Sequence, residues 1–349
     1  MADARISVAL GTRNGAEYVA QQVRSILNQR PAPCELVVGD DDSSDDTLAI
    51  IERVHAEALA AEPSLATRLT IIRRRPALGV TANFAATLAA CKGELIALSD
   101  QDDEWMPGKL ATLAAAFEAD PVLLLAHSDA RLVDADGAPL GLTLLEALEA
   151  TEVERAGLAA GAALPVLLRR NLVTGATVML RRTLLESAAP IPGEWVHDEW
   201  LAAVAAAVGR VRLVPEPLID YRQHGANQIG ARLPTLADRL ARLREPRAER
   251  AARLAHRTAL LAERGRELGV APDVQWQLDA KAAHEARRAR LSRVRLARVP
   301  TVLGGALAGR YGRYSRGAMD VLRDLVTPAG PVPVMTVAEP ADSQKGERS

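Results

Sequence analysis

The chain has little cysteine, few aromatic residues and no long apolar run. Its 349 residues include only two cysteines, Cys34 and Cys91, and neither has a cysteine or histidine partner at metal-binding spacing. This scarcity argues against a disulfide framework or a zinc site and favours a reducing compartment. No run of about 18 residues is both apolar and uncharged, so no segment clearly spans a membrane. No secretory signal is visible at the start, and we expect a cytoplasmic protein.

Charge is divided unevenly along the chain. Residues 1–230 carry 20 Lys or Arg against 31 Asp or Glu, whereas residues 231–325 carry 21 against 10. An acidic body joined to a basic arm suggests two tasks, and the arm is where an anionic surface would bind. Because 48% of the residues are apolar, the chain can bury a sizeable core, in one large domain with an appendage or in two domains.

Apolar runs and helical patterns alternate over the first 120 residues. We predict strands over Arg5–Leu10, Glu35–Val38, Arg68–Arg73 and Leu95–Leu98, and helices over Ala16–Asn28, Asp45–Ala61, Thr81–Cys91 and Pro107–Phe117. Further strands are expected over Val122–Val133, Thr174–Leu180 and Val211–Val214, with a helix over Glu199–Val208. This order predicts an α/β fold whose parallel sheet is covered on both faces. Such sheets bind ligands at the carboxyl ends of their strands.

An acidic cluster follows the fourth predicted strand. Asp100, Asp102, Asp103 and Glu104 lie within five residues, and like charges this close raise one another's pKa. A divalent cation would offset them, since Mg²⁺ and Mn²⁺ take oxygen ligands and Mg²⁺ uses one or two carboxylates with substrate phosphates. Asp100 and Asp102 share a face in strand geometry, so that one could hold the metal while the other meets a ribose. The alternative is a solvated loop whose acids cap the helix at Pro107.

A second acidic cluster follows the second predicted strand. We expect Ser44 or Asp45 to cap the next helix, which is a structural role. Asp40 and Asp41 lie before that helix and could accept hydrogen bonds from a nucleobase edge. Spacing alone does not separate that binding role from a structural one.

At these residues the chain resembles the family-2 glycosyltransferases. Seven segments carry the resemblance in order: ISVALGTRNG (6–15), ELVVGDDDSSDDT (35–47), GVTANF (79–84), GELIALSDQDDEWMPGKL (93–110), NLVTGATVMLRR (171–182), VHDEWLA (196–202) and EPLIDYRQHGANQIGA (216–231). The chain is most similar to the bacterial, rhamnosyltransferase-type branch of surface-polysaccharide assembly. The run GRYGRYSRGAMDVLRDL (309–325) is similar to that branch more weakly.

The resemblance implies a GT-A fold, which is Rossmann-like with a mainly parallel central sheet and helices on both faces. Residues 1–230 would form the catalytic domain, with a nucleotide-sugar half (1–120) and an acceptor half (121–230). A basic helical extension (231–325) and a disordered tail (326–349) would follow. The implied reaction is inverting transfer from a nucleotide diphosphate sugar, such as dTDP-rhamnose or a UDP-sugar, to a saccharide or lipid-linked saccharide in cell-surface polysaccharide biosynthesis.

Site residues carry over position by position. Thr12, Asn14, Asp40 and Asp41 would lie beside the base and ribose, and Asp100 and Asp102 would form the site for the diphosphate and a metal, Mg²⁺ or Mn²⁺. Asp198 falls where the family places its general base, and His224 lies in a late loop that would close over the diphosphate or the metal.

The chain departs from the family pattern at four positions. Arg13 stands where an aromatic residue is usual, which puts stacking on the base in doubt. Asp42 and Asp46 stand where glycines are usual, and an Asp can adopt the left-handed backbone at some cost. Glu199 replaces an aromatic residue after the His-Asp pair, which makes it the alternative base.

The chemistry of the transfer explains why these residue types are needed. A cation across the leaving diphosphate stabilises its charge, and a carboxylate must take the proton of the acceptor hydroxyl. Three tryptophans, Trp195, Trp200 and Trp105, lie near the candidate acids and could form a saccharide-binding platform that also raises the pKa of Asp198. The alternative is that Trp195 and Trp200 are core residues and Asp198 caps a helix.

The basic arm is expected to be helical from Leu233 to about Arg298, with a break near Gly269–Pro272. Lys281–Arg298 has the pattern of one strongly cationic helix. Our first interpretation is a hairpin laced with Arg and Glu that packs on the acidic body. The second is peripheral contact of residues 281–298 with an anionic membrane, at the inner face of the cytoplasmic membrane and beside a lipid-linked acceptor. Nucleic-acid binding ranks third, because no recognised module is present.

Two rival functions remain from the sequence. One is a catalytically inactive sugar-nucleotide-binding or scaffold protein of the same fold, which the departures at Arg13, Asp42 and Asp46 keep open. The other is a nucleotidyltransferase, which should have a glycine-rich phosphate loop with a basic residue after its first strand. The segment after the first predicted strand, with Gly11, Arg13 and Gly15, matches that loop weakly.

Overall fold

The computed structural model describes residues 5–224 and 247–328. Within them, nine strands form one sheet in the order β3-β2-β1-β4-β8-β6-β9-β5, and β7 pairs with β6. The strands are β1 (Ile6–Thr12), β2 (Glu35–Asp40), β3 (Arg68–Arg73), β4 (Leu95–Ser99), β5 (Glu104–Trp105), β6 (Leu123–Val133), β7 (Pro139–Thr143), β8 (Val178–Arg181) and β9 (Arg210–Arg222). Strands β1 to β4 pair with one another in parallel. Strand β8 is antiparallel to both of its neighbours, β4 and β6. The predicted α/β class is confirmed.

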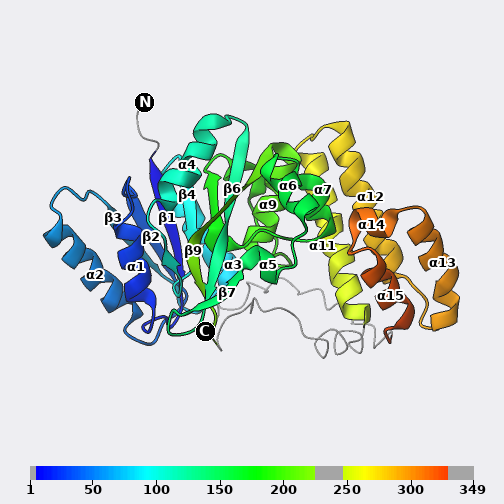
Figure 1. Ribbon diagram of the computed structural model, residues 1–349, viewed down its shortest axis with the longest axis horizontal. Coiled ribbons are helices and arrows are strands. Elements are labelled where there is room, and N and C mark those ends of the chain that lie inside the picture. Colours follow the sequence, from blue (N-terminus) through cyan, green and yellow to red (C-terminus); the bar gives the residue numbers. More distant parts are fainter. Residues whose placement is uncertain (1–4, 225–246, 329–349) are drawn as a thin grey trace, which may run out of the picture.

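Helices cover both faces of the sheet (Figure 1). One face packs against α1 (Val19–Leu27), α2 (Thr47–Ala61) and α4 (Lys109–Ala119), and the other against α3 (Val80–Ala90) and α9 (His197–Val208). Side chains of one strand alternate between the two cores: Val8 and Leu10 of β1 join the first, and Ala9 joins the second. Burial on both faces explains why these strands are continuous apolar runs.

The segment after β7 contains short helices that the sequence analysis did not predict. They are α5 (Leu144–Ala147), α6 (Glu152–Ala159), α7 (Ala163–Arg169) and α8 (Leu184–Ala188). Two of them begin with a capping box, in which Thr143 pairs with Glu146 and Thr151 with Glu154. The strand predicted over Thr174–Leu180 begins only at Val178, because Gly175–Thr177 form a 3₁₀ turn.

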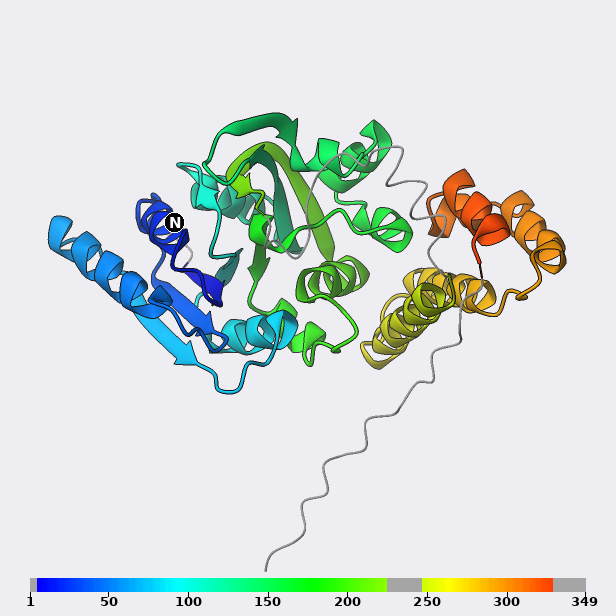
Figure 2. The ribbon, with the colours of Figure 1, turned by 90° about the horizontal axis from the view of Figure 1, so that it is seen from below.

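Five helices follow in the second described range. They are α11 (Arg247–Glu267), α12 (Pro272–Ala289), α13 (Arg295–Leu307), α14 (Arg310–Tyr314) and α15 (Ala318–Val326). The predicted break near Gly269–Pro272 lies between α11 and α12. The two helices share a hydrophobic cluster with α9 through Leu261 and Leu278. Figures 1 and 2 show α13 and α15 at the end of the molecule opposite α2. No helix of the described ranges is both long and apolar enough to cross a bilayer.

The expectation of one cationic helix over Lys281–Arg298 is wrong. Helix α12 ends at Ala289 and α13 begins at Arg295. The side chains of Lys281, Arg288 and Arg298 are buried rather than presented to solvent. The physical reason is that Asp320 and Asp324, more than twenty residues later, fold back to meet these cations together with Glu285.

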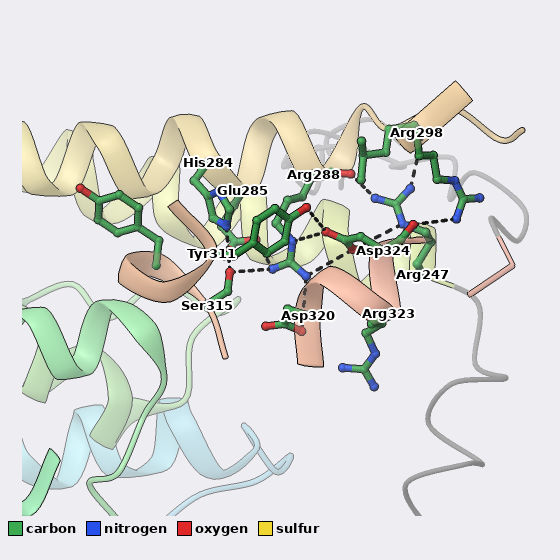
Figure 3. A network of polar contacts seen from close by, with 12 residues as sticks. Arg247, His284, Glu285, Arg288, Arg298, Tyr311, Ser315, Asp320, Arg323 and Asp324 are labelled. Atoms are coloured by element: carbon green, nitrogen blue, oxygen red, sulfur yellow. Dashed lines mark hydrogen bonds and ion pairs between the residues drawn. The ribbon is translucent and has the colours of Figure 1, made fainter. Parts of the chain in front are cut away.

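These buried charges form the network drawn in Figure 3. Arg288 Nε donates to Asp324 Oδ2 at 2.7 Å, and the Tyr311 hydroxyl donates to the same oxygen at 2.8 Å. Arg298 donates from Nη1 to the backbone carbonyl of Asp324 at 3.0 Å. The Arg247 guanidinium lies 3.8 Å from the Asp324 carboxylate. A single carboxylate therefore joins α11, α12, α14 and α15.

Replacing Asp324 with alanine should destabilise the protein by about 3–5 kcal/mol, because buried Arg247 would lose its counter-charge and buried Arg288 would keep only Glu285 and Asp320. The free energy of unfolding in urea measures this loss. Asp279→Ala is the matched control, since Asp279 pairs with Arg266 at 2.7 Å with 49% of its side chain exposed. That variant should lose no more than about 1 kcal/mol. Equal losses in the two variants would contradict the network's role.

Candidate active site

A cleft opens at the carboxyl ends of the parallel strands. Pairing places Thr12 opposite Asp40 and Leu10 opposite Ser99, so the loops after β1, β2 and β4 meet at one edge of the sheet. The cleft encloses about 1230 Å³, partly open to solvent, which is room for a nucleotide sugar. Of the residues singled out from the sequence, Thr12, Asp41, Asp100, Asp102 and Asp198 line it. The cleft therefore lies at the carboxyl ends of the parallel strands, where such sheets bind ligands.

The acidic loop after β4 has a buried cation beneath it that the sequence analysis missed. Lys109 is fully buried and donates from Nζ to the carbonyl of Ala176 at 2.6 Å. Burial lowers the pKa of Lys109 to about 7, opposed by the charges of Asp103 and Asp100. Burial, reinforced by Asp102 and Asp198, raises the pKa of Asp100 to about 7. The offsetting charge expected for this cluster is thus supplied in part by the protein.

Strand β9 brings His224 to the acidic loop. Pairing of β5 with β9 sets Glu104 opposite Asp220, so the residues after β9 lie beside Asp102. His224 Nε2 lies 2.9 Å from Asp102 Oδ2, and both side chains keep some exposure, 15% and 18%. Arg222 fastens the same loop, donating from Nε to the Asp102 carbonyl at 2.9 Å and from its backbone N–H to Asp103 at 3.1 Å.

The described residues contain no group of three or more His, Cys, Asp or Glu side chains arranged to hold a metal. Asp102 and His224 are nevertheless adjacent at the cleft, with Asp100 two residues away. This pair fits a divalent ion that takes one or two carboxylates and completes its shell with phosphate oxygens and water. An imidazole beside a carboxylate is also a ligand set for Mn²⁺.

The four residues assigned to the base and ribose fall into two groups. Thr12 and Asp41 line the cleft, and Asp41 accepts hydrogen bonds from the backbone N–H groups of Leu78 and Gly79 at 2.6 and 2.9 Å. The cleft lining does not include Asp40, which accepts from the hydroxyls of Thr12 and Ser43.

Asn14 also lies outside the cleft lining, and its side-chain oxygen accepts from the Ser44 N–H at 2.9 Å. Asp40 and Asn14 thus brace the loops rather than face a ligand. The backbone of Asp42 is left-handed, at φ 68°, as expected where the family has glycine. The same expectation for Asp46 is wrong, because its φ is −80°.

Asp198 faces the cleft from the first turn of α9. It is 7% exposed, and its Oδ2 accepts from the Gly175 N–H at 2.7 Å. Burial raises the pKa of Asp198, opposed by His197, the Gly175 N–H and Arg257. The residue in the N-cap position of α9 is Val196, so Asp198 is not the helix cap that the alternative interpretation required.

Glu199 points to the other side of α9. Its carboxylate pairs with Arg257 of α11 and lines a separate cavity between α7, α9 and α11. The Arg257 guanidinium also lies 4.1 Å over the ring of Trp195, whose Nε1 donates to the Arg257 carbonyl at 3.2 Å. His256 adds a contact to Glu194 at 3.1 Å. Helix α11 therefore holds the segment that carries Asp198.

The three tryptophans do not form a platform in the cleft, which corrects the acceptor-binding expectation. Trp200 is 1% exposed and donates to the Ala188 carbonyl, and Trp105 is 3% exposed and lies under Lys109. Trp195 is 9% exposed beneath Arg257. None of them lines the cleft, because packing of α9 and α4 on the sheet uses the rings as core residues.

Two buried polar side chains of the cleft lack protein partners at specific atoms. Asn83 Oδ1 and both ring nitrogens of His197 have no hydrogen bond within the described residues. The His197 ring stacks on Phe84 with centroids 4.1 Å apart. An unsatisfied buried polar atom costs roughly 1–3 kcal/mol, which a bound ligand with hydroxyl groups would recover. Sequence reasoning missed Asn83, although it lies in one of the family segments.

Comparison with known proteins finds a family match. Residues 7–161, less than half of the chain, match the family model described as glycosyl transferase family 2. This match supports a family-2 glycosyltransferase. Its curated relatives include an uncharacterized glycosyltransferase of Nostoc sp., 27% identical over 64% of this chain and 66% of that protein. Three mycobacterial relatives are 29% identical over 63% of this chain, and the match spans only 59% of their length.

Solved structures show that the chain has the GT-A fold. S. aureus TarS in complex with UDP-GlcNAc superposes with a TM-score of 0.53 at 18% identity, over 91% of this chain and 89% of that one. The Pyrobaculum calidifontis mannosyltransferase PcManGT, in complex with GDP-Man and Mn²⁺, gives 0.51 at 20% identity, over 93% and 85%. These identities establish the fold alone. The rhamnosyltransferase branch has no specific support among them.

Proposed function

We propose that this transferase moves a sugar, with inversion, from a nucleotide diphosphate donor to a hydroxyl of a saccharide or lipid-linked saccharide in cell-surface polysaccharide biosynthesis. One observation carries the proposal. Asp102, which contacts His224, lines one cleft together with the buried Asp198 carboxylate, and Asp198 lies close enough to raise the pKa of Asp100. A metal-binding pair and a base in one cleft are sufficient for single displacement.

The donor would lie between the loops after β1, β2 and β4. Thr12 and Asp41 are placed for the nucleoside, and Asn83 Oδ1 and the His197 ring can take hydroxyl groups of the donor. PcManGT binds GDP-Man and TarS binds UDP-GlcNAc, which supports a nucleotide sugar as the donor here. The dTDP-rhamnose and UDP-sugar donors implied by the sequence resemblance remain the first to test.

Asp102 and His224, with Asp100 beside them, are the residues that would hold Mg²⁺ or Mn²⁺. Bound there, the cation supplies Lewis-acid stabilisation of the charge on the leaving diphosphate. Buried Lys109 lies beneath the same loop and offsets part of the repulsion between the carboxylates. Arg222 fixes the loop through its contacts to Asp102 and Asp103. The protein's part at this end of the cleft is to hold a diphosphate in position.

Asp198 would take the proton of the acceptor hydroxyl. Its raised pKa brings the carboxylate closer to the operating pH, where a general base is most effective. The Gly175 N–H fixes one carboxylate oxygen and the Glu199 N–H fixes the other, and the group lines the cleft. Glu199 is the weaker candidate, because its charge is paired with Arg257 away from the cleft.

The rival functions have less support. A nucleotidyltransferase would need an open phosphate loop after β1. In this loop the Gln101 side chain fills the space beside Gly15, where an added Cβ would lie 2.2 Å from it. The Gly15 N–H donates to the Thr47 hydroxyl and is not open to a phosphate. An inactive scaffold would have no need to keep a buried, desolvated Asp198 in the cleft.

A panel of nucleotide sugars tests the proposal. Binding measured by calorimetry, with Mn²⁺ and with EDTA, should show one nucleotide diphosphate sugar whose affinity falls at least about tenfold on metal removal. Release of the nucleoside diphosphate should then accelerate when a saccharide acceptor is added. Donor binding without any release, across donors and acceptors, would support the inactive scaffold. Binding of no member of the panel would contradict the proposal as a whole.

A further inference from the structure

The outer side of α13 carries an exposed apolar stripe. Leu296, Leu303 and Leu307 are 83%, 45% and 90% exposed, and Pro300 between them is exposed as well. Their spacing of four, three and four residues places them along one line of the helix. Helix α13 has no acidic residue, and none of its residues after Arg298 is charged. A helix surface of this kind needs an apolar partner.

Helix α15 extends the same surface. It packs beside α13 and exposes Met319, Leu322 and Val326, spaced three and four residues apart. Together with Val294, seven of the fourteen large hydrophobic side chains exposed in the described ranges fall within residues 294–326. Exposed hydrophobic residues scattered singly are ordinary, but such clustering marks an interaction surface.

The surroundings of this apolar face are cationic. Residues 290–316 include seven arginines and no Asp or Glu. Arg298 is buried in the network, whereas Arg290, Arg293, Arg295 and Arg313 are exposed. Exposed arginines in these residues, with no acidic residue among them, disfavour a second copy of this face, because like charges would meet, and favour an anionic partner.

Buried contacts on the opposite side of α13 keep Leu296, Leu303 and Leu307 facing solvent. Val302 is 1% exposed in a small cluster with Leu291 and Tyr311. Arg298 donates to the carbonyls of Ser292, Asp324 and Thr327, which fixes the rotation of α13 (Figure 3). The leucines therefore cannot turn inward without breaking buried charge contacts.

We propose that the α13–α15 face, defined by Val294, Leu296, Leu303, Leu307, Met319, Leu322 and Val326, lies in the headgroup region of an anionic lipid membrane. The apolar side chains enter the acyl boundary and the arginines contact lipid phosphates. This surface overlaps the contact predicted for residues 281–298 only through residues such as Val294 and Leu296, because Lys281, Arg288 and Arg298 are buried. Because α13 and α15 lie at the end opposite α2, such contact leaves the nucleotide half clear (Figures 1 and 2). The proposal does not depend on the transfer reaction.

Co-sedimentation of the full chain with vesicles tests the proposal. Vesicles of phosphatidylcholine with phosphatidylglycerol should bind the protein at low salt, and binding should weaken as salt rises or in pure phosphatidylcholine. The triple variant Leu296→Ser, Leu303→Ser, Leu307→Ser should bind more than about tenfold more weakly. The double variant Arg293→Gln, Arg295→Gln should lose affinity mainly at low salt.

The matched control removes three exposed apolar side chains between residues 122 and 153, outside the α13–α15 face: Val122→Ser, Leu140→Ser and Val153→Ser. Its vesicle binding should equal that of the parent, since these residues lie outside the face. No binding by the full chain, or equal binding by the leucine variant, would overturn the proposal. A dimer seen by mass photometry without lipid, and abolished by the leucine variant, would instead assign the face to a second copy. Vesicle binding by a chain ending at Pro328, but not by the full chain, would indicate that residues 329–349 occupy the face instead.

Discussion

Turnover should fall roughly 10²–10⁴-fold when Asp198 is replaced by asparagine, which is the usual contribution of a general base. The fold should survive, because an asparagine oxygen can still accept one of the two backbone N–H groups, those of Gly175 and Glu199, that Asp198 accepts at 2.7 Å. Donor affinity should change little, since the metal-binding pair Asp102 and His224 belongs to a different loop of the cleft. Steady-state kinetics together with calorimetry of donor binding separate the two effects.

Glu199→Gln is the matched control for this variant. It removes a neighbouring carboxylate from the same helix turn, but that carboxylate pairs with Arg257 outside the cleft. Its turnover should stay far above that of Asp198→Asn. The opposite result, with Glu199→Gln inactive and Asp198→Asn within about threefold of the parent, would transfer the role of base to Glu199.

The second large effect is expected at the metal-binding pair. Asp102→Asn should weaken Mn²⁺-dependent donor binding by more than the roughly 10–100-fold seen when a ligand's supporting partner is lost, because Asp102 itself would contact the ion. His224→Gln should produce a smaller loss in the same measurement. In a double variant the losses should not add, since both residues serve one ion. Calorimetric titration of donor with Mn²⁺, and with EDTA, provides the measurement.

Glu104→Gln controls for the loss of one acid from the same loop. The Glu104 side chain accepts from Gln21 and does not line the cleft, so its removal should leave metal-dependent affinity unchanged. Metal-dependent binding in Asp102→Asn equal to that of the parent would remove Asp102 from the site. A parallel loss in Glu104→Gln would show that the loop's total charge matters rather than one ligand.

The part of the fold that the sequence predicted is the part fixed by local pattern. Strands β1, β2 and β4 are short apolar runs buried on both faces, and their ends carry the polar residues of the cleft. Strand β9 was predicted over only four residues because Pro215 and Pro217 interrupt the pattern. A register shift opposite Ser128 and Asp129 lets the strand continue past both prolines to Arg222.

The site residues that sequence reasoning missed depend on contacts between distant segments. Nothing near Lys109 in the chain shows that its amine is buried beneath the Asp100 loop. Likewise the sequence does not show whether the tryptophans around Asp198 are buried, because a Trp at the start of a helix is equally compatible with a core position and with a binding platform. Only the packing of α9 on the sheet decides that Trp200 is 1% exposed.

Arg257 has a consequence for how the chain can be divided. Its guanidinium covers Trp195 and pairs with Glu199, on either side of Asp198, so α11 acts as scaffold for the segment that carries the base. Coupling of this kind is reciprocal. A ligand that stabilises the segment carrying Asp198 must stabilise the packing of α11 on that segment by the same free energy. A chain cut before Arg247 would keep the described residues of the cleft and still lose this support. For variants with deletions in the helical extension, turnover should therefore be measured as well as solubility.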